Sequence, residues 1–358
     1  MNILFLTCFR KNSAGNIYGG AEKSITNLAN WFAHKRRYRV SLVSIEGDVF
    51  PYYVDKDVCH FGCNIKYKSK ILRHLAIFFN TWRTIRNSNA DVIVSFWIQP
   101  LFYALFFKPR NVKLFYSERN DPRLEYGLVA RIMRWFVLRS ASGVVFQTQD
   151  AMGYFNKKII QKSIVIHNPV YITDAQYPIK KPDNRIVAVG RLNAQKNYFL
   201  LLRAFEKISR EYPLLTLEIY GEGILRNDLQ NFIEQHRMSK KIFLKGAYKN
   251  VVDLIYGAKL FVMTSLYEGM PNALMEAMAL GIPVICSDCP CGGPRELIET
   301  GKNGYLFENG NFDELVSKMK KILDEGDLSN LINEERMICK THSSDFIFSQ
   351  WDEFFKRL

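Results

Sequence analysis

Short apolar runs alternate with helix-like segments along almost the whole chain, and this alternation most restricts the possible fold. In the first half, five runs have the length and composition of buried strands, and two segments have helical periodicity. The strands are expected at Ile3–Leu6, Val40–Ile45, Asp91–Phe96, Lys113–Ser117 and Ser142–Gln147, and the helices at Glu22–Phe32 and Arg131–Ser140. Such alternation predicts βαβ units around a parallel sheet.

A second alternation begins near residue 185, after a polar, proline-bearing segment from Asn168 to Asn184 that we interpret as a linker. Its expected strands are Arg185–Gly190, Leu215–Tyr220, Ile242–Gly246, Leu260–Ser265 and Pro283–Ser287; its expected helices are Asn197–Tyr212, Ile224–His236, Val251–Ala258, Asn272–Leu280 and Phe312–Asp324. The sequence therefore predicts an α/β protein with two Rossmann-like, doubly wound domains facing a central cleft. Ligands bind at the carboxyl ends of such strands.

The chain has 358 residues, which favours two domains, and its 48% hydrophobic content can supply a core for each. We expect one domain over residues 1–170 and another over 171–340. The last segment, residues 341–358, is apolar at helical spacing, and we expect it to pack back on the first domain.

The formal charge of +14 is concentrated in the first half. Residues 1–170 hold 25 Lys and Arg against 10 Asp and Glu, a balance of +15, whereas the rest holds 24 against 25, a balance of −1. The first half should therefore face an anionic partner such as nucleic acid, phospholipid headgroups or a phosphorylated acceptor. No apolar run is long enough to span a membrane, and the N-terminal residues are typical of a buried strand instead of a signal peptide.

The seven cysteines are spread along the chain and are interpreted as reduced thiols of a cytosolic protein. Cys286, Cys289 and Cys291 form a cluster, but no second ligand pair follows at a suitable spacing. Three cysteines this close would also strain a tetrahedral site, so we expect no bound metal.

Two carboxylates, Glu268 and Glu276, bracket a tight turn that opens into a helix. Carboxylates accept hydrogen bonds from sugar hydroxyls, so two spaced carboxylates could hold two different polyols. The first backbone N–H groups of a helix favour a phosphate. Together these features predict a site for a sugar, a phosphate and a ribose.

Arg191 and Lys196 lie between an expected strand and the helix that follows it, where two cations could hold a diphosphate. A solvated loop with two exposed charges explains the same residues equally well.

Two glycine turns follow other strands. In Gly19-Gly20-Ala21-Glu22 the backbone could approach a ligand closely, although a simple turn before a helix is the alternative. The pattern around it does not match the fingerprint Gly-x-Gly-x-x-Gly, which disfavours classical NAD binding. Gly221, in Tyr220-Gly221-Glu222-Gly223, could line a nucleotide pocket or be an ordinary turn.

The segment Lys66–Arg86 has the pattern of a basic amphipathic helix. Its apolar face comprises Ile71, Leu72, Leu75, Phe78, Phe79, Trp82 and Ile85; the surrounding cations include Lys66, Lys68, Lys70, Arg73, His74, Arg83 and Arg86. Such a helix is typical of an anionic membrane interface, whereas a core-packed helix with a solvated basic face is the alternative. Leu101–Arg110 has the same aromatic and basic character.

Taken in order, these motifs resemble those of the retaining GT-B glycosyltransferases of family 4. The resemblance is carried by Gly190-Arg191 with Lys196-Asn197, by Glu268 to Ala277, and by Gly281-Ile282-Pro283. It covers nearly the whole chain. Ser117 to Pro122 and Ser287 to Glu296 are similar to segments of bacterial enzymes that build capsule, O-antigen or lipid-linked oligosaccharide, some of which transfer N-acetylgalactosamine.

The resemblance implies a role for each site residue. Arg191 and Lys196 would neutralise the donor diphosphate and, with Glu268, form the catalytic group; Glu268 would hold sugar hydroxyls and Glu276 the ribose. The donor-binding set would be Gly20, Arg191, Lys196, Gly221, Glu268, Gly269, Met270, Pro271, Asn272, Ala273 and Glu276. Cationic side chains and helix ends would replace a metal, and no cofactor is expected because the nucleotide-sugar is a co-substrate.

The first domain departs from the family pattern. Many members carry a histidine near the sugar, whereas the matching segment here is Tyr116-Ser117-Glu118-Arg119-Asn120. Glu118, Arg119 and Asn120 are candidates for contacts with donor or acceptor, and the sequence assigns none of them a role.

The resemblance thus implies a retaining, metal-independent hexosyltransferase, with the acceptor and membrane on the first domain and the nucleotide-sugar on the second. The resemblance alone implies a UDP-linked donor and a polyprenyl-pyrophosphate glycan as acceptor, at the inner face of the cytoplasmic membrane. Phe78, Phe79, Trp82, Lys70 and Arg73 would meet that membrane. A GT-B epimerase acting on a soluble substrate is the alternative. Nucleic-acid binding is disfavoured, because the aromatics lie on amphipathic faces.

Overall fold

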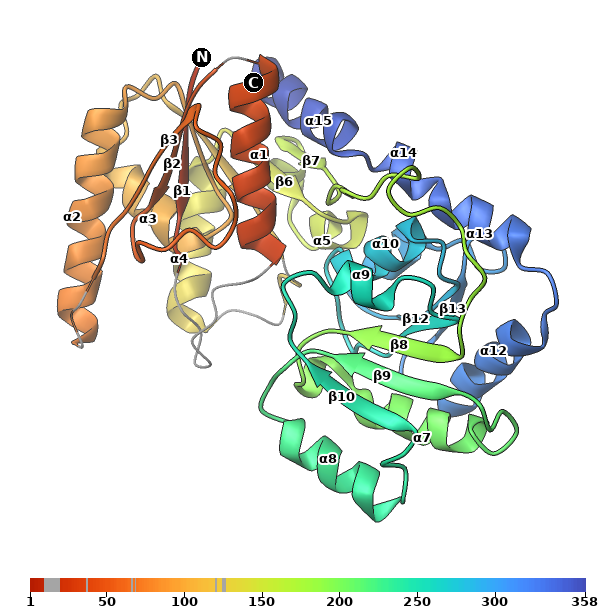
Figure 1. Cartoon of the computed structure of the whole chain (residues 1–358). Coiled ribbons are helices and arrows are strands. Elements are labelled where there is room, and N and C mark those ends of the chain that lie inside the picture. Colours follow the sequence, from red (N-terminus) through yellow and green to blue (C-terminus); the bar gives the residue numbers. More distant parts are fainter. Residues whose placement is uncertain (10–19, 37, 66, 68, 120, 124–126) are drawn as a thin grey trace. The chain divides into compact units, whose positions relative to one another are not determined.

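A computed structural model describes residues 1–9, 20–36, 38–65, 67, 69–119, 121–123 and 127–358. The chain forms two compact units (Figure 1). Unit 1 comprises Met1–Asn168 and Ile347–Leu358, and unit 2 comprises Pro169–Phe346. The expected boundary after residue 170 lies two residues beyond the observed one, and residues 341–346 belong to unit 2.

Unit 1 contains a seven-stranded parallel sheet in the order β3-β2-β1-β4-β5-β6-β7. The strands are β1 Asn2–Thr7, β2 Arg39–Ser44, β3 Val58–Gly62, β4 Val92–Ser95, β5 Lys113–Ser117, β6 Gly143–Phe146 and β7 Ser163–Val165. The five strands predicted for this half are confirmed. β3 and β7 were missed, because β3 is a mostly exposed edge strand and β7 has only three residues. Neither therefore forms an apolar run.

The helices of unit 1 cover both faces of this sheet, with α2, α3 and α4 on one face and α1 on the other (Figure 1). They are α1 Gly20–Arg36, α2 Lys70–Ser88, α3 Ile98–Phe107, α4 Leu128–Ser140, α5 Gln149–Gly153 and α6 Lys157–Ile160. The central strands β4 and β6 are buried at every residue, as expected for a parallel sheet between two helical layers.

The C-terminal helix α15, Ser344–Arg357, packs against α1 and the sheet of unit 1 through its apolar side. The Phe355 ring lies 5.4 Å from that of Phe32 and 4.6 Å from that of Phe115. Asp352 is 1% exposed and accepts a hydrogen bond from the Tyr38 hydroxyl. Helical spacing of the aromatics thus produces one buried stripe, which fixes the end of the chain on unit 1.

Unit 2 contains a six-stranded parallel sheet in the order β10-β9-β8-β11-β12-β13. The strands are β8 Arg185–Val189, β9 Thr216–Tyr220, β10 Ile242–Gly246, β11 Leu260–Met263, β12 Val284–Asp288 and β13 Tyr305–Glu308. The strand order reverses between β8 and β11, and this reversal is where doubly wound sheets bind their ligands.

The helices of unit 2 bury an apolar core on both sides of its sheet. They are the 3-10 turn η1 Ala194–Lys196, and α7 Tyr198–Ile208, α8 Arg226–Gln235, α9 Val251–Ile255, α10 Asn272–Ala279, α11 Gly293–Leu297, α12 Phe312–Asp324, α13 Ser329–Arg336 and α14 Ile338–Thr341. Residues 171–184 contain no helix or strand, in keeping with the linker interpretation. Two Rossmann-like parallel sheets confirm the predicted fold class.

Candidate active site

The residues that were predicted to bind a diphosphate and a sugar meet at the carboxyl edge of the unit 2 sheet. Arg191 and Lys196 follow β8, and Glu268 follows β11. Because β8 and β11 are neighbouring parallel strands, both loops leave the sheet at the same end, and the strand order reverses between them, where doubly wound sheets bind ligands. The sheet topology therefore brings together side chains that are 72 residues apart.

Lys196 and Glu268 form an ion pair at the centre of this edge. Lys196 Nζ donates a hydrogen bond to Glu268 Oε1 over 2.5 Å. Their side chains are 13% and 10% exposed, so the pair is largely withdrawn from solvent and weakly screened. An ammonium group has three donors, and one of them used on Glu268 leaves two for a ligand. Arg191 is exposed beside this pair.

Hydrogen bonds join the segment carrying Lys196 to the segment carrying Glu268. Gln195 Nε2 donates to Tyr267 O over 2.9 Å, and Leu266 N donates to Gln195 O over 2.7 Å. Thr264 Oγ1 donates to Lys196 O over 2.9 Å. These bonds fix the backbones on both sides of the ion pair, so the pair is held by the fold.

Gly190 and Tyr198 lie close to the side chain of Lys196. The Tyr198 hydroxyl donates to Gly190 O over 3.1 Å. A Cβ atom at Gly190 would lie 2.7 Å from Lys196 Cε, so only glycine lets the lysine chain pass this closely. Burial, followed by the negative charge of Glu268, raises the pKa of Tyr198 far above its ordinary value. The hydroxyl therefore stays protonated and remains a donor.

A backbone contact fixes the turn after Glu268. Glu268 N donates to Pro290 O over 2.7 Å, and Cys291 N donates to Glu268 O over 3.0 Å. A Cβ atom at Gly293 would lie only 1.7 Å from Gly269 O. The loop after β12 thus holds the loop after β11. Sequence reasoning missed the positioning role of Gly293, although the Gly-Gly-Pro motif was a usable signal.

Helix α10 begins immediately after this turn and carries the second carboxylate. Met270 and Pro271 are buried, whereas Asn272, Ala273 and Glu276 are partly exposed. The first N–H groups of α10 have no partner within the helix and carry its positive dipole end. Glu276 lies one turn further along. A phosphate at the helix start and a hydroxyl group at Glu276 would therefore lie about one helical turn apart, roughly 5 Å.

Gly221 lies at the end of β9, next to the end of β8. A Cβ atom there would lie 1.9 Å from Gly190 O. Gly221 N also donates to Gly246 O over 2.8 Å. The structure thus gives Gly221 a packing role between strand ends, in addition to the predicted donor contact.

The unit 1 candidates occupy different surroundings. Gly20 is exposed at the start of α1, and Asn120 lies outside the described residues, as does Gly19. Glu118 is 2% exposed, and Arg134 Nη1 lies 3.6 Å from its Oε2, so this pair joins the end of β5 to α4. The Arg119 guanidinium lies 3.8 Å from the Phe96 ring centroid and donates to Asn168 Oδ1 over 2.6 Å.

The cysteine cluster is part of the core. Cys286, Cys289 and Cys291 are buried and form no disulfide. Burial, with the charge of Glu268 next, raises the pKa of Cys289 to about 12, so its thiol stays protonated. No group of three or more metal-ligating side chains occurs in the part of the chain that the structure describes.

The residues predicted to meet a membrane divide between two environments. Phe79 and Trp82 are 59% and 40% exposed. Phe78, in contrast, is half-buried against α3, with its ring 4.5 Å from that of Phe107. Arg73 pairs with Glu46, and Lys66, Lys68 and the side chain of Lys70 are not among the described groups. None of the described helices is long and apolar enough to cross a membrane.

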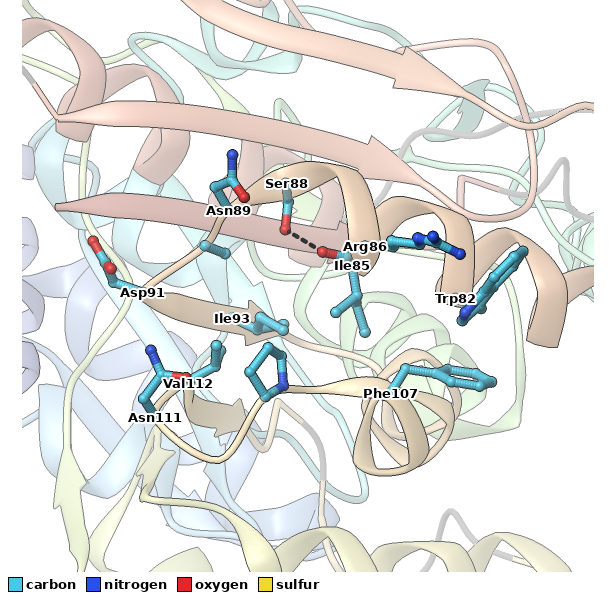
Figure 2. A pocket seen from close by; sticks show the side chains of 12 residues that line it. Trp82, Ile85, Arg86, Ser88, Asn89, Asp91, Ile93, Phe107, Asn111 and Val112 are labelled. Carbon is cyan, nitrogen blue, oxygen red and sulfur yellow. Dashed lines mark hydrogen bonds between the residues drawn. The ribbon is translucent and has the colours of Figure 1, made fainter.

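A cavity of ≈ 470 Å³ lies in unit 1, at the ends of α2 and α3 (Figure 2). Figure 2 shows Trp82 and Phe107 at one end, Asn89, Asp91 and Asn111 at the other, and Ile93 between them. The cavity opens beside the start of β4, which is the opposite sheet edge from the carboxyl ends. It is therefore separate from the candidate active site.

Comparisons with known proteins identify the family of the chain. The chain matches Glycosyltransferase Family 4 over residues 18–173 and Glycosyl transferases group 1 over residues 172–338. The chain is a GT-B glycosyltransferase of family 4. An uncharacterized glycosyltransferase of Methanocaldococcus jannaschii is 30% identical over 67% of this chain and 65% of its own length.

This glycosyltransferase is also similar to two bacterial proteins. The N-acetylgalactosamine-N,N'-diacetylbacillosaminyl-diphospho-undecaprenol 4-alpha-N-acetylgalactosaminyltransferase of Campylobacter jejuni is 26% identical over 87% of this chain and 88% of its own. Anabaena Alr3699/HepE, solved in complex with UDP and glucose, has a TM-score of 0.81 and 19% identity, covering 100% of both chains. The latter similarity establishes the fold alone.

Proposed function

We propose that this glycosyltransferase moves a hexose or N-acetylhexosamine from a UDP-sugar to a polyprenyl-pyrophosphate-linked glycan, with retention at the anomeric carbon and without a metal. The observation that carries the proposal is the buried Lys196–Glu268 pair at the strand reversal of unit 2. The pair supports the proposal because a cation suited to a diphosphate and a carboxylate suited to sugar hydroxyls lie within one hydrogen bond of each other.

In this proposal each site residue has one task. Lys196 and Arg191 neutralise the diphosphate, aided by the first N–H groups of α10. Glu268 accepts hydrogen bonds from the sugar, and Glu276 accepts them from the ribose. These cationic and dipolar groups supply the positive charge that a metal supplies in other transferases.

The reaction then needs no protein nucleophile. The bond between the anomeric carbon and the diphosphate oxygen breaks while the acceptor oxygen bonds to the same face of that carbon. The departing diphosphate takes the proton of the acceptor hydroxyl. Lys196 and Arg191 stabilise the charge that develops on the leaving group, which is where preorganised cations contribute most.

The acceptor and the setting are supported by similarity and composition. The Campylobacter relative is named for a diphospho-undecaprenol acceptor. All seven cysteines are free, which fits a reducing compartment. We therefore propose that the enzyme works in bacterial surface polysaccharide or glycoprotein glycan synthesis, bound peripherally to the inner face of the cytoplasmic membrane.

A panel of nucleotide-sugars tests the donor assignment. UDP-hexoses and UDP-N-acetylhexosamines should raise the melting temperature, since a bound donor stabilises the folded state by mass action. GDP-, ADP- and dTDP-sugars serve as controls. A larger shift with any of these would contradict the UDP assignment.

Transfer to a polyprenyl-pyrophosphate glycan, analysed by NMR, tests the reaction. We expect an α-linked product from an α-linked donor, formed at the same rate with and without EDTA. A β-linked product would exclude retention, and loss of activity in EDTA would exclude metal independence. Conversion of the UDP-sugar to its epimer without acceptor would instead establish the epimerase alternative.

A further inference from the structure

A second exposed amphipathic helix, α4, lies on the same face of unit 1 as α2 (Figure 1). Leu128, Val129 and Ile132 on α4 are 75%, 70% and 50% exposed, and Trp135 and Phe136 are 55% and 44% exposed. Its inner side is fixed by Val137, Leu138 and the Arg134–Glu118 pair. The helix is therefore held in place on its inner side while its outer apolar side chains remain exposed.

Aromatic contacts connect α4 to α2 through α3. The Phe78 ring lies 5.9 Å from Phe79 and 6.1 Å from Phe106. Phe102 continues the series at 5.5 Å from Phe106 and 6.1 Å from Phe136. The Trp135 ring lies 4.8 Å from Phe136. The exposed apolar residues of the three helices thus form one continuous surface.

We call this surface the aromatic belt. Its outward-facing members are Leu75, Phe79 and Trp82 on α2, Phe106 on α3, and Val129, Ile132, Trp135 and Phe136 on α4. A patch of this extent is unusual on a protein surface that meets only water, and it marks an interaction site.

The formal charges on the three helices that form the belt are all of one sign. The sequences of α2, α3 and α4 contain no Asp or Glu. Arg83 and Arg86 are exposed on α2, and Arg131 and Arg139 on α4; within the described residues, none of these four arginines forms an ion pair. The guanidinium groups of Arg86 and Arg139 lie 5.5 Å and 5.4 Å from the ring centroids of Trp82 and Trp135.

We infer that the aromatic belt docks on an anionic phospholipid surface, and that α2 and α4 are both required for it. Tryptophan and phenylalanine side chains with flanking arginines are the groups that enter the boundary between headgroups and acyl chains. Because α2 and α4 are joined through α3, they would contact the bilayer over a broad surface. Two contacting helices fix the orientation of unit 1 on the bilayer more strictly than one helix can.

The charge pattern argues against a second copy of the chain as the occupant. In a twofold symmetric dimer each patch faces itself, so the arginines of one belt would approach those of the other. The three helices themselves carry no carboxylate that would compensate that repulsion. An anionic bilayer supplies the compensating charge.

This inference extends the membrane part of the proposed function but does not depend on the donor or the acceptor. It is tested with the full chain on sucrose-loaded vesicles of phosphatidylcholine containing about one-third phosphatidylglycerol, against vesicles of phosphatidylcholine alone. UDP binding, followed by thermal shift, runs in parallel, so that failure of membrane docking is distinguishable from failure of the proposed transferase activity.

Three variants separate the parts of the belt. Ile132→Glu with Trp135→Glu changes α4, and Phe79→Glu with Trp82→Glu changes α2. Arg131→Gln with Arg139→Gln removes two cations. The matched control is Leu214→Glu with Ile224→Glu in unit 2, because these apolar residues are 76% and 86% exposed outside the belt.

Each belt variant with two glutamates should lower binding to anionic vesicles about tenfold or more, since it places charge in the apolar boundary. The arginine variant should lower it about 30-fold at low salt, because each cation contributes about fivefold near an anionic surface. The control should bind like the unaltered chain, and all variants should keep their response to UDP.

Two results would overturn the inference. The first is unchanged vesicle binding in the α4 variant while the α2 variant loses it, which would restrict docking to α2. The second is a shift from dimer to monomer in light scattering without an effect on vesicles, which would make the belt a protein interface.

Discussion

The two units share the strand order of a doubly wound sheet, but their helices present different surfaces to solvent. In unit 2 several surface charges of the helices are paired, as in Arg210–Glu206, Lys318–Glu314 and Lys320–Glu211. In unit 1, α2 and α4 carry arginines, all three of α2, α3 and α4 carry aromatics, and none of the three has a carboxylate. The strand ends of unit 2 hold the candidate active site, and the helical layer of unit 1 holds the proposed docking surface.

Under the proposed function, the reaction site and the membrane-binding surface lie on different units of the chain. The charged pair of unit 2 is buried among hydrogen-bonded loops, where screening is weak and geometry is fixed. Arg83, Arg86, Arg131 and Arg139 of unit 1 are exposed, where each contributes about fivefold to binding of an anionic surface and the total depends on their number. Substitutions should therefore act locally and strongly in unit 2, but cumulatively in unit 1.

The largest effect is expected from Lys196→Met, which should abolish most of the catalysis and leave membrane binding intact. Loss of this cation at the developing charge should lower kcat about 100- to 1000-fold, while vesicle binding stays unchanged. Glu268, left buried without its cation, should also lower the free energy of unfolding by about 3 kcal/mol. Steady-state kinetics and urea unfolding measure the two effects.

Two further variants show which effect is which. Lys196→Met with Glu268→Gln should recover much of the stability without recovering activity. Lys207→Met, whose surface partner Asp313 is 87% exposed, should change neither quantity. Full activity in Lys196→Met would refute the assigned role.

Glu276→Ala should weaken UDP binding about 10- to 100-fold, because a charge-assisted hydrogen bond to the ribose is lost. Isothermal titration calorimetry measures this, with the exposed Glu234→Ala on α8 as the control. An unchanged affinity would mean that Glu276 does not hold the ribose.

Gly293→Ala tests whether the contact between the loops after β11 and β12 holds the candidate active site in place. The new Cβ atom would lie 1.7 Å from Gly269 O, so the two loops must separate. We expect the free energy of unfolding to fall by about 1–3 kcal/mol and activity to fall with it. Gly326→Ala is the matched control, since nothing lies within 4 Å of its Cβ position. Equal melting temperatures for the two variants would contradict the prediction.

The smallest effect is expected from Glu335→Gln, within the core of unit 2. Glu335 is 0% exposed, and its Oε1 accepts a hydrogen bond from Val284 N over 3.0 Å. Burial raises its pKa well above the ordinary 4.5. The contribution of Glu335 to stability is therefore present below pH 4.5 and is lost as pH rises toward the folded pKa, because the unfolded chain releases the proton first.

The glutamine side chain does not titrate, so Glu335→Gln should gain stability relative to the unaltered chain as pH rises. Urea unfolding at about pH 4.5 and about pH 8 measures the difference, which should be close to zero at the lower pH. A difference that does not vary with pH would show that Glu335 titrates normally.

Much of the fold was predictable because its signals are local. Buried parallel strands such as Val92–Ser95 are continuous apolar runs, and a helix such as α12 shows its period over its own residues. β3 and α3 were not predicted, because they lack such a local signal. β3 is an exposed edge without an apolar run, and α3 is apolar nearly all round, so neither shows a diagnostic period.

The site was predictable as a set of residues but not as a set of contacts. The motifs gave Arg191, Lys196, Glu268 and Glu276. Nothing in the spacing showed that Lys196 would bond to Glu268 or that Glu118 would be buried against Arg134. Both pairs join segments that are distant in sequence or lie on different elements, and only the packed sheet brings them together.

The sequence by itself determined two doubly wound sheets, the candidate residues at the ends of their strands, and a first half rich in cations. The tertiary structure decided which groups face one another and which face water. On α2 a single apolar stripe divides, with Ile85 6% exposed and Trp82 40% exposed, because the angle at which a helix rests on its sheet is set by its neighbours. For the same reason, only the packing of α3 between α2 and α4 joins two separate helices into one surface.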